Sequence, residues 1–163
     1  MDIRDKAARY LSRCSRTEKE LSDYLRKNKF EEEEIKEVIN EFVDYGYLND
    51  RSYSWEFFRY SMDKGWGKYK IFHELAKRGI DQSMAEMEYE DFLEENRDKE
   101  YSESKRAKAV ADKIVYIEGR DENGRVSDKT KGKIARRLKS YGYSSGIIYE
   151  IIENLNWGSD FFD

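Results

Sequence analysis

Apolar residues recur with the spacing of amphipathic helices along almost the whole chain. From Ile35 to Val43 they occupy positions i, i+3, i+4, i+7 and i+8, which form one face of a helix with about 3.6 residues per turn. The first predicted helix has a similar apolar face: Ile3, Ala7, Tyr10, Leu11 and Cys14. We therefore expect the Cys14 thiol to be buried as a small apolar group. Since the 163 residues contain no proline to interrupt this pattern, the sequence predicts an all-α protein.

Local signals predict where several of these helices begin and end. Ser15 and Glu18 have the spacing of a capping box, so we expect a second helix to begin there. Asp81 is the expected N-terminal cap of a sixth helix. Glycine, which readily adopts the left-handed conformation of a C-terminal cap, follows three of the predicted helices: Gly46, Gly79 and Gly142. Together with the apolar periodicity, these signals delimit nine helices.

The nine predicted helices divide into three similar units. Corresponding positions include Leu21, Ile71 and Ile134, then Leu25, Leu75 and Leu138, and four residues later Lys29, Gly79 and Gly142. The predicted boundaries are residues 1–48, 49–100 and 101–163, with an exposed loop inserted near residues 119–128 of the third unit. Small helical repeats usually stack in a row, so we expect three tandem, helix-turn-helix-like three-helix repeats in an elongated or curved array.

One position departs from this repeat pattern. Lys29 replaces the glycine that ends the second helix of the other two repeats. Because a side chain disfavours the left-handed conformation, we expect the end of this helix to differ from its counterparts.

The composition narrows the range of functions. Hydrophobic residues make up 38% of the chain, which argues against intrinsic disorder although charged residues reach 40%. One cysteine excludes an internal disulfide, and one histidine argues against a His/Cys metal cage. No apolar run reaches the roughly 18 residues of a membrane span, and the charged N-terminus does not resemble a signal sequence. We expect a cytoplasmic protein without a cofactor or a membrane partner.

The sequence offers little for catalysis. His73 lies between Phe72 and Glu74 on a predicted helix, where no cysteine is available for it to activate. The acidic run at residues 31–34 suggests metal binding, but consecutive helical residues point in different directions. At a helix start these carboxylates instead interact favourably with the macrodipole. We therefore expect a protein without enzymatic activity and without a metal site.

Basic residues are concentrated in the third predicted repeat. Residues 105–139 contain 12 basic and 5 acidic side chains, although the whole chain has a net charge of −4. One candidate binding group lies on the predicted eighth helix: Lys129, Lys133, Arg136 and Arg137. A second group borders the predicted fifth helix: Lys68, Lys70, Lys77 and Arg78. Such stripes suit DNA phosphates or an acidic protein surface, and the alternative for each is a solvated helix face.

Several motifs resemble those of the RecX family. Residues 46–50 (GYLND), followed by Tyr53 and Phe57, are similar to the stretch that joins the first two repeats of that family. Further likeness is carried by Gly65, Gly67, Ile71, residues 74–75, residues 79–80 and residues 15–25. The resemblance spans essentially the whole chain. It implies three tandem three-helix repeats that bind the RecA nucleoprotein filament and restrain its ATPase and strand exchange during recombination and DNA repair. We expect the protein to be a monomer.

An alternative hypothesis is a helical protein that binds DNA directly. It predicts affinity for bare DNA with a steep dependence on salt, whereas the filament hypothesis predicts that RecA greatly enhances recruitment. The negative net charge disfavours strong autonomous binding to DNA, so contact with DNA is expected mainly through the filament.

Overall fold

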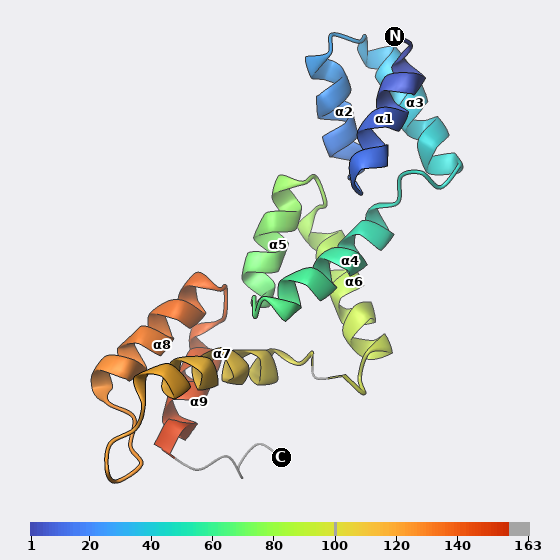
Figure 1. Cartoon of the computed structure of the whole chain (residues 1–163). Helices are drawn as coiled ribbons and strands as arrows, with labels where there is room; N and C mark the ends of the chain where they lie inside the picture. The colour runs from blue at the N-terminus through green and yellow to red at the C-terminus, as the bar shows by residue number, and fades with distance from the viewer. Residues whose placement is uncertain (100, 157–163) are drawn as a thin grey trace. The chain divides into compact units, whose positions relative to one another are not determined.

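The structure, a computed structural model, describes residues 1–99 and 101–156. These residues form nine α-helices and one 3-10 turn, and none of them lies in a β-strand (Figure 1). The helices are α1 (Ile3–Arg13), α2 (Glu18–Lys27), α3 (Glu32–Asp44), α4 (Asp50–Asp63), α5 (Lys68–Lys77), α6 (Gln82–Glu95), α7 (Glu103–Glu118), α8 (Asp128–Ser140) and α9 (Ser145–Glu153). The prediction of an all-α fold is therefore confirmed.

The chain divides into two compact units. Unit 1 contains Met1–Phe57 and Glu74–Glu90, and unit 2 contains Phe58–His73 and the described residues from Asp91 onward. Helices α4, α5 and α6 each contribute to both units. Residue 100, at the predicted end of the second repeat, and residues 157–163, at the predicted end of the third, lie outside the described residues.

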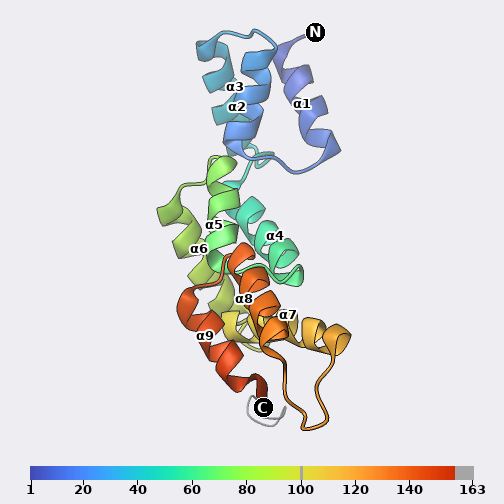
Figure 2. The same ribbon diagram turned by 90° about the vertical axis from the view of Figure 1, so that its left-hand side faces the viewer.

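In unit 1, the apolar faces of α1, α2 and α3 form one core (Figure 2). Its buried members are Ile3, Ala7, Leu21, Leu25, Ile35, Val38, Phe42 and Leu48. At the edge of this core, the rings of Tyr10 and Tyr24 stack with centroids 4.0 Å apart. The apolar positions that recur with helical spacing in the sequence therefore form the buried face of each helix.

Two details of unit 1 differ from the expectations. The capping box of α2 uses Thr17 and Glu20: the Thr17 hydroxyl accepts from the Glu20 amide at 3.1 Å, and the Glu20 carboxylate accepts from the Thr17 amide at 3.0 Å. The predicted pair of Ser15 and Glu18 is wrong because the helix begins two residues later. Cys14 is exposed, not buried, because α1 ends at Arg13 and the extended backbone of Cys14 turns it away from the apolar face.

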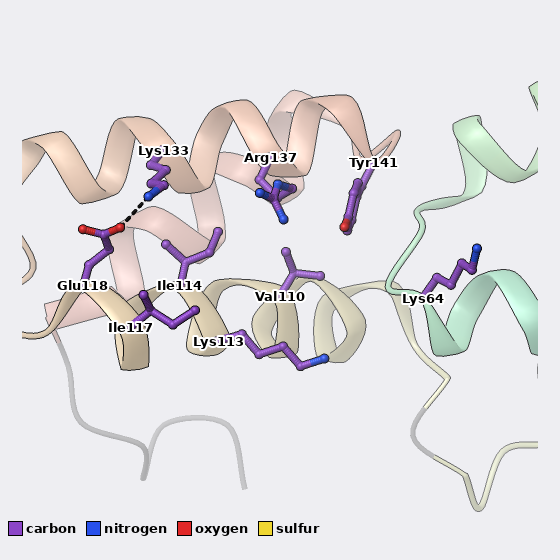
Figure 3. Close-up of a pocket in the computed structure, with 9 residues that line it drawn as sticks. All are labelled: Lys64, Val110, Lys113, Ile114, Ile117, Glu118, Lys133, Arg137 and Tyr141. Atoms are coloured by element: carbon purple, nitrogen blue, oxygen red, sulfur yellow. Dashed lines mark hydrogen bonds and ion pairs between the residues drawn. The ribbon is translucent and has the colours of Figure 1, made fainter.

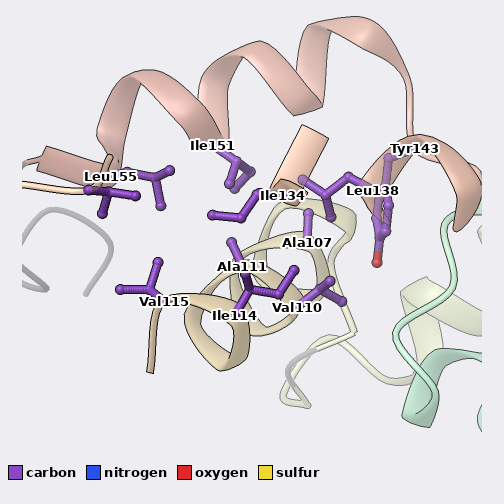
Figure 4. Packing of buried hydrophobic residues seen from close by; sticks show 11 residues of the cluster. Ala107, Val110, Ala111, Ile114, Val115, Ile134, Leu138, Tyr143, Ile151 and Leu155 are labelled. Atoms are coloured by element: carbon purple, nitrogen blue, oxygen red, sulfur yellow. The ribbon is translucent and has the colours of Figure 1, made fainter. Parts of the chain in front are cut away.

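In unit 2, α7, α8 and α9 enclose a second core (Figure 4). Its buried members are Ala107, Val110, Ala111, Ile114, Val115, Val126, Ile134, Leu138, Tyr143, Ile151 and Leu155. The loop that joins α7 to α8 projects from this bundle (Figures 1 and 2). The Asp121 carboxylate organises it by accepting from the amides of Asn123 and Arg125, at 2.9 and 2.8 Å. Residues 119–127 lie outside the helices; Val126 is buried and Asp128 begins α8.

Within unit 1, the start of α2 packs on the turn after α5. The Thr17 hydroxyl donates to the Arg78 carbonyl at 2.6 Å. A Cβ atom added to Gly79 would lie 2.6 Å from Cδ of Lys19 and closer still to its Cβ. We call this contact of Thr17 and Lys19 with Arg78 and Gly79 the first joint.

Within unit 2, the start of α5 packs in the same way on the turn after α8. The Gly67 amide donates to the Tyr141 carbonyl at 2.7 Å, and the Tyr69 amide donates to the Gly142 carbonyl at 3.3 Å. A Cβ atom on Gly142 would lie 2.6 Å from Cβ of Lys70 and closer still to its backbone nitrogen. We call this contact the second joint. In the repeat alignment Gly67, Tyr141 and Gly142 correspond to Thr17, Arg78 and Gly79, whereas Lys70 follows the counterpart of Lys19 by one residue.

Lys29 lies at the position that corresponds to Gly79 and Gly142. It nevertheless adopts the same left-handed conformation, with a φ of 65° beside 86° and 85° for the two glycines. The hydrogen bond from Phe30 to the Leu25 carbonyl, 3.3 Å long, matches that from Ile80 to the Leu75 carbonyl. The expectation that this helix end differs is therefore wrong: the motif is retained, and its lysine side chain is exposed.

Candidate partner-binding groove

Unit 2 has a groove between α7 and α8 with a volume of about 280 Å³ (Figure 3). Helix α7 contributes one face, helix α8 contributes side chains from above in this view, and the turn after α4 contributes Lys64 at one end. Its lining residues are Lys64, Val110, Lys113, Ile114, Ile117, Glu118, Lys133, Arg137 and Tyr141.

The floor of the groove is aliphatic. Val110, Ile114 and Ile117 are spaced by four and three residues, so they share one side of α7. Val110 and Ile114 also belong to the core and are only 8% exposed, whereas Ile117 is 78% exposed. The apolar stripe of α7 therefore continues from the core onto the surface. Ile117 is thus the exposed aliphatic side chain of this floor.

The rim of the groove is cationic. It has four basic side chains, Lys64, Lys113, Lys133 and Arg137, and one carboxylate, Glu118. Lys133 forms an ion pair with Glu118, drawn as a dashed line in Figure 3. The hydrogen bond from Lys133 lowers the pKa of the Glu118 carboxyl, which therefore remains ionised at neutral pH. The lining thus has a net charge of +3.

Three of these cations have no carboxylate partner among the described residues. The Arg137 guanidinium lies 5.6 Å from the ring centroid of Tyr141, and the Lys64 ammonium lies 4.4 Å from that of Tyr60. Lys113 is exposed beside the aliphatic floor. Because no internal carboxylate neutralises them, these groups are available to an anionic partner.

The structure divides the four predicted residues of α8 into two pairs. Lys133 and Arg137 line the groove and extend from α8 towards α7 (Figure 3). Lys129 and Arg136 are exposed outside it, and the Arg136 guanidinium lies over Gly132. All four are exposed, so the helix presents a continuous basic surface beside the groove.

Lys68 and Lys70, from the other predicted group, belong to unit 2. The Lys70 ammonium lies 4.3 Å from the ring centroid of Trp66, and its backbone is part of the second joint. The Lys68 amide donates a hydrogen bond to the Glu103 carboxylate, at 3.0 Å. These contacts give both residues a role in internal packing.

Lys77 and Arg78 belong to unit 1. Both pair with Glu74, at 3.0 and 3.1 Å respectively. The Arg78 guanidinium also lies 4.8 Å from the ring centroid of Phe57, and its carbonyl accepts the hydrogen bond of the first joint. Arg78 is therefore engaged inside the unit, whereas the Lys77 side chain remains 58% exposed.

Comparison with known proteins identifies the family of the chain. The family model "RecX, first three-helix domain" matches residues 4–42, and "RecX, second three-helix domain" matches residues 49–87. A "Regulatory protein RecX" of Clostridium acetobutylicum is 30% identical over 156 residues, which cover 93% of this chain and 68% of that protein. The chain belongs to the RecX family.

Other RecX proteins extend the comparison. The crystal structure of RecX from Lactobacillus salivarius is similar with a TM-score of 0.74 and 29% identity, over 94% of both chains. A "Regulatory protein RecX" of Lactobacillus delbrueckii subsp. bulgaricus is 29% identical over 93% of this chain, which spans only 52% of that protein. The fold of this RecX chain is thus that of a solved relative, while some relatives are nearly twice as long.

Sequence reasoning missed the contribution of α7 to the groove. Lys113 and Glu118 lie in the basic segment of residues 105–139, but neither they nor Ile117 belonged to a predicted binding group. The signal was present, because Ile117 follows Val110 by seven residues and therefore continues the same face. Lys64 could not be found in this way, since it comes from a distant segment of the RecX chain.

Two further features of the described residues bear on function. No group of three or more His, Cys, Asp and Glu side chains is arranged to hold a metal ion in this part of the chain. Over the same residues, no helix is both long and apolar enough to cross a bilayer.

Proposed function

We propose that this RecX-family protein is a non-catalytic regulator that acts in the cytoplasm, where it binds the RecA nucleoprotein filament and lowers its ATPase and strand-exchange activity in recombination and DNA repair. The observation that carries the proposal is the likeness to proteins named regulatory protein RecX along 93% of the chain. The groove supports it physically, because unpaired cations around an aliphatic floor suit binding to a partner.

The basic residues of α8 are the proposed contacts in the third repeat. Lys133 and Arg137 would act within the groove, and Lys129 and Arg136 beside it. In the second repeat, the proposed contacts are Lys68, Lys70, Lys77 and Arg78. Lys77 is the most exposed of them, while the other three also take part in internal packing. The partner would be recognised through many weak contacts, which together give affinity without any chemical step.

The test is the ATPase rate of the cognate RecA on single-stranded DNA, titrated with this protein below equimolar ratios. We expect a steep fall in the rate. The triple variant Lys133→Glu, Arg136→Glu and Arg137→Glu should lose most of this inhibition. A matched triple variant, Arg9→Glu, Arg13→Glu and Lys27→Glu, reverses three exposed cations of unit 1 and should retain it. An unchanged ATPase rate at every ratio would refute the proposal.

The basic excess of residues 105–139 favours a second candidate, direct binding to DNA. It is separated from the first by measuring affinity for single-stranded and duplex DNA at several salt concentrations, without and with RecA. Filament regulation predicts that RecA strengthens recruitment greatly. Tight, salt-sensitive binding to DNA alone, without any effect on the ATPase, would favour the second candidate.

A further inference from the structure

We propose that the groove between α7 and α8 binds an acidic peptide segment that carries apolar side chains. This inference rests on the proposed function in one respect, since such a segment would belong to the regulated protein partner. It goes further by naming the chemistry of the bound element and by assigning residues of α7, Lys113 and Ile117, to its recognition.

The charge of the groove selects an anion. Lys133 is neutralised by Glu118, which leaves Lys64, Lys113 and Arg137 without a carboxylate partner among the described residues. Arg137 extends into the groove from α8, and Lys113 lies along its α7 side (Figure 3). A carboxylate beside either cation would receive a charge-assisted hydrogen bond.

The aliphatic floor distinguishes a peptide from a nucleic acid. Proteins that bind single-stranded nucleic acids place aromatic rings where bases can stack. Here the floor consists of Val110, Ile114 and Ile117, and Tyr141 is the one aromatic residue in the lining. The Tyr141 ring is itself flanked by Arg137 and by Lys70, at 5.6 and 5.5 Å. Branched aliphatic side chains instead favour contact with leucine-like or phenylalanine-like groups.

The size of the groove fits this occupant. A volume of about 280 Å³ is at the lower limit of small-molecule sites, which typically measure about 300–1,000 Å³. It accommodates individual side chains of a bound segment, with the remainder of that segment on the surface. Ile117, which is 78% exposed, would lose most of its contact with water on binding and is therefore the expected apolar anchor.

The experiment uses the full chain and fluorescently labelled peptides built from Asp, Leu and Phe. Fluorescence anisotropy should show saturable binding of this peptide. A matched peptide with Lys in place of each Asp, and another with Ser in place of each Leu and Phe, should each bind at least about tenfold more weakly. A labelled oligothymidylate serves as the single-stranded DNA probe.

Variants then locate the binding site. Arg137→Glu and Ile117→Ser should each weaken binding of the acidic apolar peptide by about tenfold or more. Lys139→Glu makes the same change of charge on α8 outside the groove, and Val43→Ser makes the same apolar-to-polar change on α3. Both controls should bind as the unaltered protein does. All four side chains are exposed, so the variants are expected to keep their helical content in circular dichroism.

Three outcomes would overturn the inference: no peptide binding, equal loss in Arg137→Glu and Lys139→Glu, or stronger binding of the oligothymidylate with loss in the same groove variants. The RecA ATPase assay on the same proteins separates this inference from the proposed function. Inhibition without peptide binding would remove only the inference. Peptide binding in the groove without inhibition would support the site and remove the filament as its partner.

Discussion

The first and second joints have corresponding geometry but different chemistry. In the first, a side-chain hydroxyl of Thr17 donates to the carbonyl before the left-handed glycine. In the second, the backbone amide of Gly67 donates to the corresponding carbonyl, that of Tyr141. The two main chains approach each other more closely in the second joint. A Cβ atom on Gly67 would lie 2.8 Å from the Gly142 carbonyl oxygen.

This comparison shows what sets the residue type at a repeat position. The first joint needs one glycine, Gly79, and the start of α2 keeps a side chain on Thr17. The second joint needs glycine on both sides because two main chains meet directly. The neighbouring electrostatics also differ, with an ion pair of Glu74 and Arg78 in one joint and Arg137 beside the Tyr141 ring in the other.

The largest expected effect is that of Gly142→Ala. The left-handed φ of 85° would cost alanine about 1–2 kcal/mol. Overlap of the added Cβ with the Lys70 backbone would cost about a further 1–3 kcal/mol, because a main chain cannot move aside locally. Urea unfolding should show this loss of stability. Hydrogen exchange should show faster exchange of the Gly67 and Tyr69 amides.

Gly46→Ala is the matched control for this variant. Gly46 has a φ of 80°, and a Cβ atom there would have no neighbour within 4 Å, so only the backbone cost applies. Gly79→Ala should also exceed this control, because its Cβ would overlap the Cβ of Lys19, which is fixed to the main chain. Equal losses for all three variants would contradict the distinction between the joints.

Thr17→Val should destabilise the first joint by about 2 kcal/mol. It removes a helix cap, at about 1 kcal/mol, and leaves the Arg78 carbonyl without this donor, at about 1 kcal/mol or more. Ser102→Ala removes a cap whose hydroxyl accepts from the Lys105 amide, at an exposed position. The loss of stability in Thr17→Val beyond that in Ser102→Ala, measured by urea unfolding, gives the contribution of the joint. No excess would contradict a role for the hydroxyl.

A smaller effect is expected from pH at the ion pair of the first joint. Hydrogen bonds from Lys77, and then from Arg78, lower the pKa of the Glu74 carboxyl. The folded state therefore binds this proton less readily than the unfolded state, so the stabilisation is present above the unfolded pKa and is lost as pH falls through the folded pKa. The stability difference between the unaltered protein and Glu74→Gln should shrink below about pH 4. A difference that does not change with pH would contradict this cause.

The smallest effect is expected for Lys29→Gly. It relieves the strain of a side chain at a φ of 65°, about 1 kcal/mol, but the greater freedom of glycine in the unfolded chain offsets much of that gain. We expect a change in the free energy of unfolding of less than about 1 kcal/mol, on the stabilising side. A clear destabilisation would indicate that the Lys29 side chain makes contacts that matter for the fold.

Most of the helical fold could be predicted because periodicity is a local property of the sequence. Leu21, Leu25, Ile35 and Val38 are buried as their spacing requires. Cys14 shows the limit of the method, since the periodic pattern continues one residue beyond the end of the helix. The left-handed turn at Lys29 was missed because its hydrogen bonds are made by the backbone, and the sequence suggests them only when glycine is present.

The candidate site was predicted only in part, for a different reason. Lys133 and Arg137 follow from the face of one helix, whereas the groove also needs Lys64 and Ile117 from other segments. Arg78 resembles a surface cation in sequence, and its engagement by Phe57 depends on the fold. Which basic residues remain available to a partner is therefore a tertiary property, and charge patterns alone could not reveal it.

The exposed turn at Lys29 has a consequence for self-assembly. The left-handed turn packs against a helix start in both joints, whereas the corresponding turn at Lys29 is exposed. Complementary halves on one molecule are a geometric route to open-ended fibres, because each copy can add to the next. At Lys29, however, a lysine side chain occupies the place where both glycines have only a hydrogen atom. A helix start docked on this turn, as in the two joints, would meet that side chain, which disfavours head-to-tail contact through it.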